Sequence, residues 1–496
     1  MNIARGIGAI VRRWWNRMIP YSNIAQAEQV QTPLSPDMAS ALALWYDLYR
    51  DRAPWKEPGK VKSLNLAALA AGEIARQVVL ELEWDVKASD VGHETSEIEI
   101  LRKDDSNPYQ SDRTSQYLTR HPTRAAYLKA EFQKLMDALR QKLEVGCAAG
   151  GMIVKPWPNP ADGHIYFDCA MDWGIYPLAF DDGGNLSDVI IPDVFREGNA
   201  IYTRLERHRL QGERVIITQR AFRSTAEGSL GCEVPLASVS RWAALAPEAE
   251  VTGAEGMLFG WFRVASANAA DAGCPLGASV FAKGVDVIRE IDMQYSRLLW
   301  EFEGGELAVD VDPTALYEKS DGKGRVLPKL NERLFRAVDS GAESTYEVFA
   351  PTLRDGSLVN GLNQLLMRFE DLTGLSRGTF SDANVDARTA TELKIVKQRS
   401  YATVADNQKA LEKCLRDVLR AMDKYATIYR LAPEGDWEAT FEWDDSILID
   451  ADEQLRQRLL LLDAGVIGRA ELRQWYLGES AEQAAEALRA VREEGK

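Results

Sequence analysis

Apolar residues recur every three or four positions in several long stretches of this chain, which is the period of an α-helix. The longest such stretch runs from Thr389 to Tyr429 without glycine or proline, and it would measure about 60 Å at 1.5 Å per residue. The spacing also predicts helices over Ser63–Leu82, from Pro122 to a stop at Gly146, and over Gly284–Phe302, Asp355–Leu372 and Ser480–Glu494.

Between the helix predicted to stop at Gly146 and the helix predicted to begin at Gly284, the pattern changes to short runs rich in β-branched and aromatic residues, bounded by turn residues. Such runs are typical of strands. Strands are predicted over Met152–Lys155, Ile165–Asp168, Val189–Val194, Ile201–Leu210, Val215–Arg220 and Leu258–Val264, with another at Thr440–Trp443. Strands gathered in one region and flanked by helices indicate an α+β fold.

Length and composition set the outer limits. The chain has 496 residues, which is too long for one compact core, so we expect several domains or an extended architecture. No run of about 18 uncharged apolar residues predicts a membrane-spanning helix. The five cysteines stand singly, so neither a zinc site nor a disulfide framework is indicated.

The first 19 residues form a separate basic and amphipathic segment. Arg5, Arg12, Arg13 and Arg17 alternate with apolar residues that include Trp14 and Trp15. A segment of this kind can dock on a partner or on a neighbouring subunit, or it can lie on a membrane surface. Docking is the favoured interpretation, and a membrane-associated adaptor is kept as an alternative.

Two motifs that carry catalysis are missing from the sequence. There is no phosphate-binding GxxxxGK[ST] loop and no HExxH motif, and nothing in the sequence singles out a Ser–His–Asp triad, so we expect no catalytic residue, no metal site and no cofactor. Asp181–Asn185 lacks the closing glutamate of a calcium loop and is better explained as a turn. The acidic cluster Asp444–Glu453 can be read as a magnesium-dependent nuclease site, although carboxylates at the start of a helix favour capping.

Charge is unevenly distributed along the chain. The net charge is −16, which argues against broad binding of nucleic acid. Residues 285–318 carry nine acidic and two basic side chains, a balance of −7, and residues 319–336 reverse this to +4. The two stretches indicate either ordinary solvated surfaces or a repulsive wall beside a basic docking patch.

Several blocks of sequence occur in an order that resembles one known family. Gly374–Ser381 reads GLSRGTFS and is followed by Arg388 and TATE at 389–392; upstream lies PLGASVF at 275–281, and FEWDDSI stands at 441–447. These blocks resemble portal proteins of long-tailed bacteriophages over roughly residues 60 to 490. The loop after Ser381 is shorter than the family pattern and lacks its glycines, so the resemblance leaves its conformation open.

The resemblance implies a portal fold assembled as a cyclic ring, usually of twelve subunits. Its parts would be a wing, a two-helix stem, a clip, a tunnel loop and a mainly helical crown. By position these would be the N-terminal segment 1–19, the α+β wing 20–270, the first stem helix 271–304, the clip 305–351, the second stem helix 352–373, the tunnel loop 374–388, the long wing helix 389–430, and the wing end and crown 431–496.

The resemblance also implies a function without catalysis. Such a ring forms the DNA channel at one capsid vertex, nucleates procapsid assembly, docks the terminase large subunit, allows genome ejection and connects head to tail. Its partners would be major capsid and scaffolding proteins, head-completion, adaptor and tail proteins, and the double-stranded DNA. It would be assembled in the host bacterial cytoplasm and reside in the virion, with membrane binding not expected.

The same resemblance names candidate site residues. Channel-lining candidates are Glu290, Glu301, Glu303 and Glu306; a negative wall would discourage tight contacts with phosphate. Alternatively, these acids pair with bases of the neighbouring subunit. Tunnel-loop candidates are Ser376, Arg377, Thr379, Phe380, Ser381, Asn384 and Arg388, with the two arginines nearest the DNA. Clip candidates facing terminase or the adaptor are Lys319, Lys323, Arg325 and Lys329.

Overall fold

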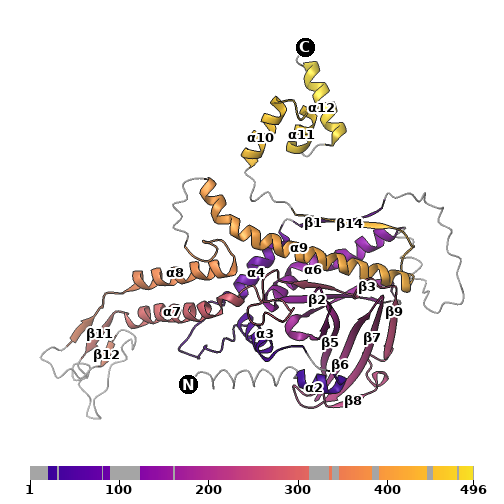
Figure 1. Ribbon diagram of the computed structural model, residues 1–496. Coiled ribbons are helices and arrows are strands. Elements are labelled where there is room, and N and C mark those ends of the chain that lie inside the picture. Colours follow the sequence, from indigo (N-terminus) through magenta and orange to yellow (C-terminus); the bar gives the residue numbers. More distant parts are fainter. Residues whose placement is uncertain are drawn as a thin grey trace, which may run out of the picture.

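A computed structural model gives the fold, and it combines a sheet-rich body with long helices (Figure 1). The described residues are 21–30, 33–80, 82–89, 123–159, 162–311, 335–337, 346–382, 390–443, 451–477 and 480–494. Helices and strands are both abundant, so the predicted α+β class is confirmed.

The largest sheet is antiparallel and six-stranded, with the order β4-β5-β6-β7-β8 and with β9 also paired to β7. Its strands are β4 (Tyr176–Phe180), β5 (Leu186–Glu197), β6 (Ala200–Gln211), β7 (Arg214–Ser224), β8 (Cys232–Val234) and β9 (Glu248–Thr252). The three strands predicted here from sequence are β5, β6 and β7, each longer than expected. Their partners β4, β8 and β9 are short, so their alternation of apolar and polar residues is too brief to predict a strand.

Three smaller sheets join distant parts of the chain. Their orders are β10-β2-β3, β1-β14 and β12-β11-β13. The strands are β1 (Leu82–Ala88), β2 (Gly151–Asn159), β3 (His164–Met171), β10 (Gly260–Arg263), β11 (Ala308–Val311), β12 (Phe335–Ala337), β13 (Tyr346–Phe349) and β14 (Trp437–Trp443). In the β1-β14 pair, Trp84 lies opposite Phe441, so one strand from each end of the chain closes this sheet.

The helices of the described residues are α2 (Tyr21–Glu28), α3 (Pro36–Tyr49), α4 (Leu66–Val79), α6 (Arg124–Ala149), α7 (Val285–Gly304), α8 (Asp355–Thr373), α9 (Ala390–Ile428), α10 (Ala451–Asp463), α11 (Arg469–Leu477) and α12 (Ala481–Glu494). Helices α4, α6, α7, α8, α9 and α12 lie where the periodicity predicts them, with shifts at their ends, whereas α2 and α3 were not predicted. The segment 271–304 is helical from Val285 onward, with a single 3-10 turn (Ala282–Gly284) before it.

The predicted stop of α6 at Gly146 is wrong. The helix continues to Ala149, and Gly150 then takes a φ of +92°, the left-handed conformation in which glycine commonly ends helices. A side chain at Gly150 would also strike the backbone of Gly277, with its Cβ 2.5 Å from the carbonyl oxygen. The C-cap is therefore the second glycine of this region and not the first.

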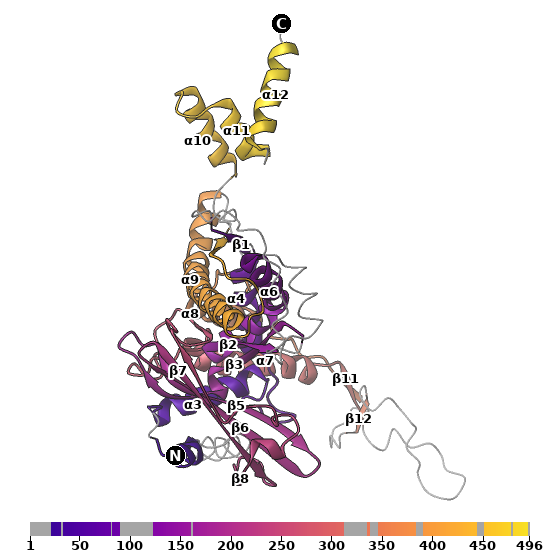
Figure 2. The same cartoon turned by 90° about the vertical axis from the view of Figure 1, so that its right-hand side faces the viewer.

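The main core lies where α9 packs against the β10-β2-β3 sheet and against α4 and α6 (Figures 1 and 2). The 39 residues of α9 extend for about 58 Å at 1.5 Å per residue. Its residues Leu411, Leu415 and Val418 are fully buried in the same cluster as Ile288 and Phe369. The bases of α7 and α8 are therefore fixed in the core.

Candidate functional site

Helices α7 and α8 form an antiparallel hairpin that projects from the body, with β11 and β12 at its far end (Figure 1). The facing apolar stripes include Ile291 and Leu298 of α7 and Leu362 of α8. The amide of Gln294 donates a hydrogen bond to the carbonyl oxygen of Leu358 at 3.3 Å, which joins the two helices midway. The apolar stripes predicted the two helices, while their pairing as a stem was implied only by the resemblance.

One acid of the −7 stretch is buried and not available to a channel. Asp292 is fully buried and accepts hydrogen bonds from the indole Nε1 of Trp55 at 2.9 Å and from the backbone N–H of Leu64 at 3.1 Å. Burial raises the pKa of its carboxyl group. Asp292 therefore attaches the segment between α3 and α4 to the side of α7.

A second acid is paired across the hairpin. The carboxylate of Glu301, near the end of α7, accepts hydrogen bonds from the side chain of Arg354 at 2.7 and 3.1 Å and from its backbone N–H at 3.0 Å. The hydrogen bond from the Arg354 side chain lowers the pKa of Glu301 to about 2. Glu301 is thus ionised, and its charge is balanced within its own chain.

The other three channel candidates have different surroundings. The side chain of Glu290 is half exposed and lies 3.2 Å from that of Arg289. Glu303 is 68% exposed, with Lys62 at 3.8 Å. Glu306 is half-buried. Glu290 and Glu303 are the two candidates whose carboxylates are most open to solvent.

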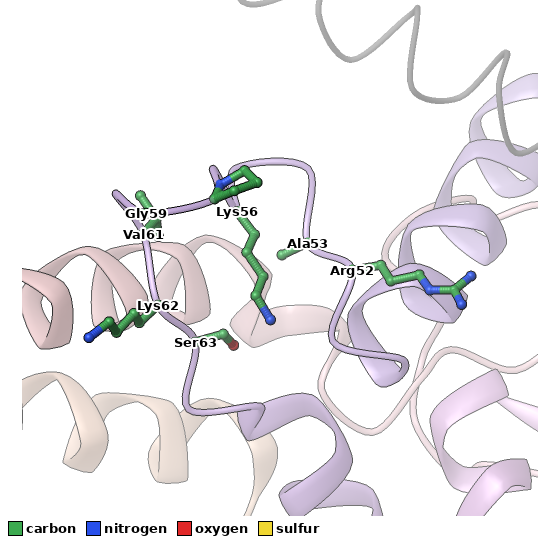
Figure 3. Close-up of a pocket in the computed structure, with 8 residues that line it drawn as sticks. Arg52, Ala53, Lys56, Gly59, Val61, Lys62 and Ser63 are labelled. Carbon is green, nitrogen blue, oxygen red and sulfur yellow. The ribbon is translucent and has the colours of Figure 1, made fainter.

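The segment that Asp292 holds also encloses a surface hollow of about 650 Å³ beside α7 (Figure 3). The residues that line it include Arg52, Lys56 and Lys62. Lys56 is paired with Asp51, and Lys62 lies near Glu303. The cations of this hollow therefore belong in part to local ion pairs.

The turn after α8 is held by one buried carboxylate. Glu370 is fully buried, and its two oxygens accept hydrogen bonds from the backbone N–H groups of Gly378, Phe380 and Ser381, and from the Ser381 hydroxyl at 2.7 Å. The turn begins at Gly374, whose φ of +75° ends α8; a Cβ there would lie 2.3 Å from the Thr403 hydroxyl of α9. The GLSRGTFS block is therefore a compact turn folded back on α8.

Further contacts place the remaining described tunnel-loop candidates. The hydroxyl of Thr379 donates to the carbonyl oxygen of Ser376 at 2.6 Å, and the ring of Phe380 lies 6.2 Å from that of Phe369. The guanidinium of Arg377 makes a two-pronged ion pair with Asp371, at 2.8 and 3.1 Å, which raises the pKa of Arg377. Arg377 is more than half exposed, but it has an acidic partner in its own chain.

Some candidates lie outside the described residues. These are Asn384 and Arg388 of the tunnel loop, the clip residues Lys319, Lys323, Arg325 and Lys329, the N-terminal segment 1–19, and Asp444, Asp445 and Asp450 of the acidic cluster. Asp452 and Glu453 stand in the first turn of α10.

Two further expectations concern ions and membranes. Asp181–Asn185 is the predicted turn: the Asp181 carboxylate accepts from the Asn185 N–H at 2.7 Å, and the Asp181 carbonyl oxygen accepts from the Gly184 N–H at 2.9 Å. Among the described residues, no three histidine, cysteine, aspartate or glutamate side chains gather as a metal site. Within that same part of the chain, no helix has the length and apolarity to cross a membrane.

Sequence reasoning missed Glu370 and Asp292, although both left a signal. Glu370 follows Leu366 by four residues and Leu362 by eight, and Asp292 follows Ile288 by four, so both acids fall in the apolar stripe of a helix. A carboxylate in such a stripe is buried with the stripe and must find hydrogen-bond donors. Their partners, however, come from other segments and cannot be read from the spacing.

Comparison with known proteins identifies the family. No curated protein matches the chain significantly. A family model described as phage portal protein, SPP1 Gp6-like, matches residues 132–496, which includes the α7–α8 hairpin, the Glu370 turn and α9. Portal proteins of this family are non-enzymatic components of the phage capsid, so the nuclease alternative is not retained. The chain belongs to the SPP1 Gp6-like family of phage portal proteins.

Proposed function

We propose that this chain assembles head to tail into a closed ring that forms the DNA channel at one capsid vertex. The proposed number of subunits is twelve, the usual number in portal rings. The family match over residues 132–496 carries this proposal. The α7–α8 hairpin supports it, because a projecting pair of amphipathic helices gives each subunit two different flanks, as a ring of heterologous contacts requires.

Each part of the portal fold would correspond to particular helices and strands of this chain. The body built from residues 20–270 and the long helix within 389–430 would be the wing. Helices α7 and α8, in segments 271–304 and 352–373, would be the stem. Residues 305–351 would be the clip, 374–388 the tunnel loop, and 431–496 the wing end and crown.

The channel wall in this proposal carries exposed negative charge chiefly from Glu290 and Glu303. Both carboxylates are open to solvent, whereas Glu301 is balanced by Arg354. A ring repeats each carboxylate in every subunit and produces a field that discourages lasting contact with DNA phosphates. Glu306 would be a secondary member of this wall.

Two sets of basic residues would have roles in this ring, one near the DNA and the other toward the terminase motor. Arg377 and Arg388 would lie in or beside the loop nearest the DNA. Arg377 would contact a DNA phosphate only briefly, because the carboxylate of Asp371 competes with the phosphate for its guanidinium. Lys319, Lys323, Arg325 and Lys329 would dock the terminase large subunit or an adaptor, mainly by speeding association.

The ring would then serve at every stage of the virion. It would nucleate procapsid assembly with the major capsid and scaffolding proteins in the host bacterial cytoplasm, admit and release double-stranded DNA, and hold head-completion and tail proteins. The ATP-driven motor is a separate protein in this scheme, which agrees with the absence of a phosphate-binding loop from the sequence.

Complementation tests the proposal. A phage whose copy of this gene is interrupted is grown in cells that supply either this chain or the same chain with all four clip bases changed to glutamate. The wild-type chain should restore DNA-filled heads. The variant should form rings but yield empty heads, and normal filling by the variant would exclude the docking role. Failure of the wild-type chain to restore filled heads would contradict the proposed function.

A further inference from the structure

The carboxylate of Glu370 is the centre of the turn Gly374–Asp382. It stands in the last turn of α8, is fully buried, and accepts four hydrogen bonds. One oxygen accepts from the N–H groups of Phe380 at 2.5 Å and Ser381 at 2.8 Å; the other accepts from the Gly378 N–H at 3.2 Å and the Ser381 hydroxyl at 2.7 Å. All four donors come from one short stretch of chain.

These bonds replace those that a strand or helix would have supplied. The backbone of residues 378–381 belongs to neither, and the N–H groups of Gly378, Phe380 and Ser381 find their acceptor in Glu370 instead. Hydrogen bonds to an ionised carboxylate are roughly twice as strong as bonds between neutral groups. One side chain on a rigid helix therefore determines the path of the turn.

Two more attachments join the same turn to α8. The Asn363 side chain accepts from the Asp382 N–H at 2.8 Å and donates to its carbonyl oxygen at 3.3 Å. At the other end, the Leu375 N–H donates to the Glu370 carbonyl oxygen at 3.0 Å. The segment Gly374–Asp382 is thus attached to α8 at its own beginning, middle and end. The points of attachment on α8 extend from Asn363 to Glu370, which is about two helical turns.

We propose that Glu370 is the positioning residue of this turn: its carboxylate makes Gly374–Asp382 move with α8 as one unit, and this attachment is needed for DNA to be packaged through the ring. The proposal rests on the proposed function, since only a channel gives the turn DNA to meet. Glu370 itself is buried and touches no DNA.

The test uses Glu370→Gln in the full-length ring. Glutamine keeps the size of the side chain but has one acceptor oxygen, and its NH₂ group would face N–H donors. Amide hydrogen exchange of Gly378, Phe380 and Ser381 should accelerate at least about tenfold, because a hydrogen bond to a charged acceptor is roughly twice as strong as one to a neutral acceptor. Exchange in α9 and in residues 358–366 of α8 should stay as in wild type.

The matched control is Asp371→Asn, which removes the adjacent carboxylate of α8 and its ion pair to Arg377 but leaves the carboxylate of Glu370 in place. It should leave exchange at residues 378–381 unchanged. If Glu370→Gln yields too little folded ring, Ser381→Ala is used: it removes one of the four donors and should accelerate Gly378 by a smaller factor. The two changes together should accelerate exchange less than the product of their separate effects, since they act on one network.

Packaging gives the readout that a merely structural role would not move. Glu370→Gln rings of normal mass and melting temperature should yield several-fold fewer DNA-filled heads than wild type. Unchanged exchange at residues 378–381, equal acceleration throughout α8 and α9, or normal filling despite a loosened turn would each overturn the proposal. Failure of the proposed function is distinguishable, because wild-type chain would then fail to restore filled heads while the exchange contrast persisted.

Discussion

Arg354 holds Glu301 at the far end of the hairpin, with a shortest contact of 2.7 Å between guanidinium and carboxylate. The pair joins the last turn of α7 to the residue before α8, so it closes the hairpin where the chain leaves for β11 and returns from β13. Glu303, two residues farther on, has a longer contact: among the described residues its ion-pair partner is Lys62 at 3.8 Å.

This difference predicts unequal effects of charge reversal. Glu301→Lys places a second cation beside Arg354 and should lower the melting temperature, whereas Glu303→Lys should change it little. The deficit of Glu301→Lys should shrink in 1 M salt, where the screening length is about 3 Å. Thermal unfolding at low and high salt measures both. Equal melting temperatures for the two variants would show that the pair does not hold the hairpin.

Asp292 should matter far more to stability than its exposed neighbour Glu290. Asp292→Ala leaves the Trp55 indole N–H and the Leu64 N–H without their acceptor, and each buried unsatisfied donor costs about 1–3 kcal/mol. Glu290→Ala should stay within about 0.5 kcal/mol. Urea unfolding compares the free energies of unfolding. A loss for Asp292→Ala no larger than for Glu290→Ala would contradict the anchoring role.

Asp172 predicts a pH dependence of stability. It is fully buried beside Trp261, whose indole N–H donates to it at 3.1 Å, and desolvation raises its pKa from 3.8 to about 7. The folded state thus binds this proton more tightly than the unfolded state. The stabilisation present below about pH 4 is lost as pH rises to about 7, with a slope of at most about 1.4 kcal/mol per pH unit.

Asp172→Asn removes this titration, so its free energy of unfolding should depend less on pH between 4 and 7 than that of wild type. Asp182→Asn, in an exposed turn, is the control and should follow wild type. Denaturant unfolding at pH 5 and pH 8 gives the comparison. Parallel curves for all three proteins would mean that Asp172 does not titrate in this range.

The channel wall predicts an effect of charge on DNA movement. Changing Glu290 and Glu303 together to lysine should slow DNA passage and make retention dependent on salt, because the new cations release counterions condensed on DNA. Translocation measured at low and moderate salt tests this. Variants that match wild type at low salt would exclude these carboxylates from the wall and leave the family assignment intact.

The elements that could be predicted from sequence are those with long unbroken periodicity. The α7, α8 and α9 bounds agree with the apolar stripes to within a residue or two, because each stripe has a partner surface: α9 packs against the core, and α7 and α8 pack against each other. The pairing of β1 with β14 could not be predicted, since Trp84 and Phe441 are brought together by the whole fold between them.

The candidate site could likewise be predicted only in part. The GLSRGTFS block indicated a turn, but its attachment to Glu370 depends on how far the turn folds back. Likewise, the charge count over residues 285–318 treated all acids alike, while the structure buries Asp292 and pairs Glu301 with Arg354. Local charge is visible in a sequence; the partners that neutralise it come from tertiary contacts.

The most direct test of the central claim is the mass and shape of the purified full-length protein in solution. Mass measurement of single particles and negative-stain microscopy should show closed rings with a central hole, many times heavier than the 55.3 kDa chain. Scaffolding and capsid proteins are added in a parallel sample, because they can promote closure. Monomers without rings in both samples, at every concentration, would contradict the account.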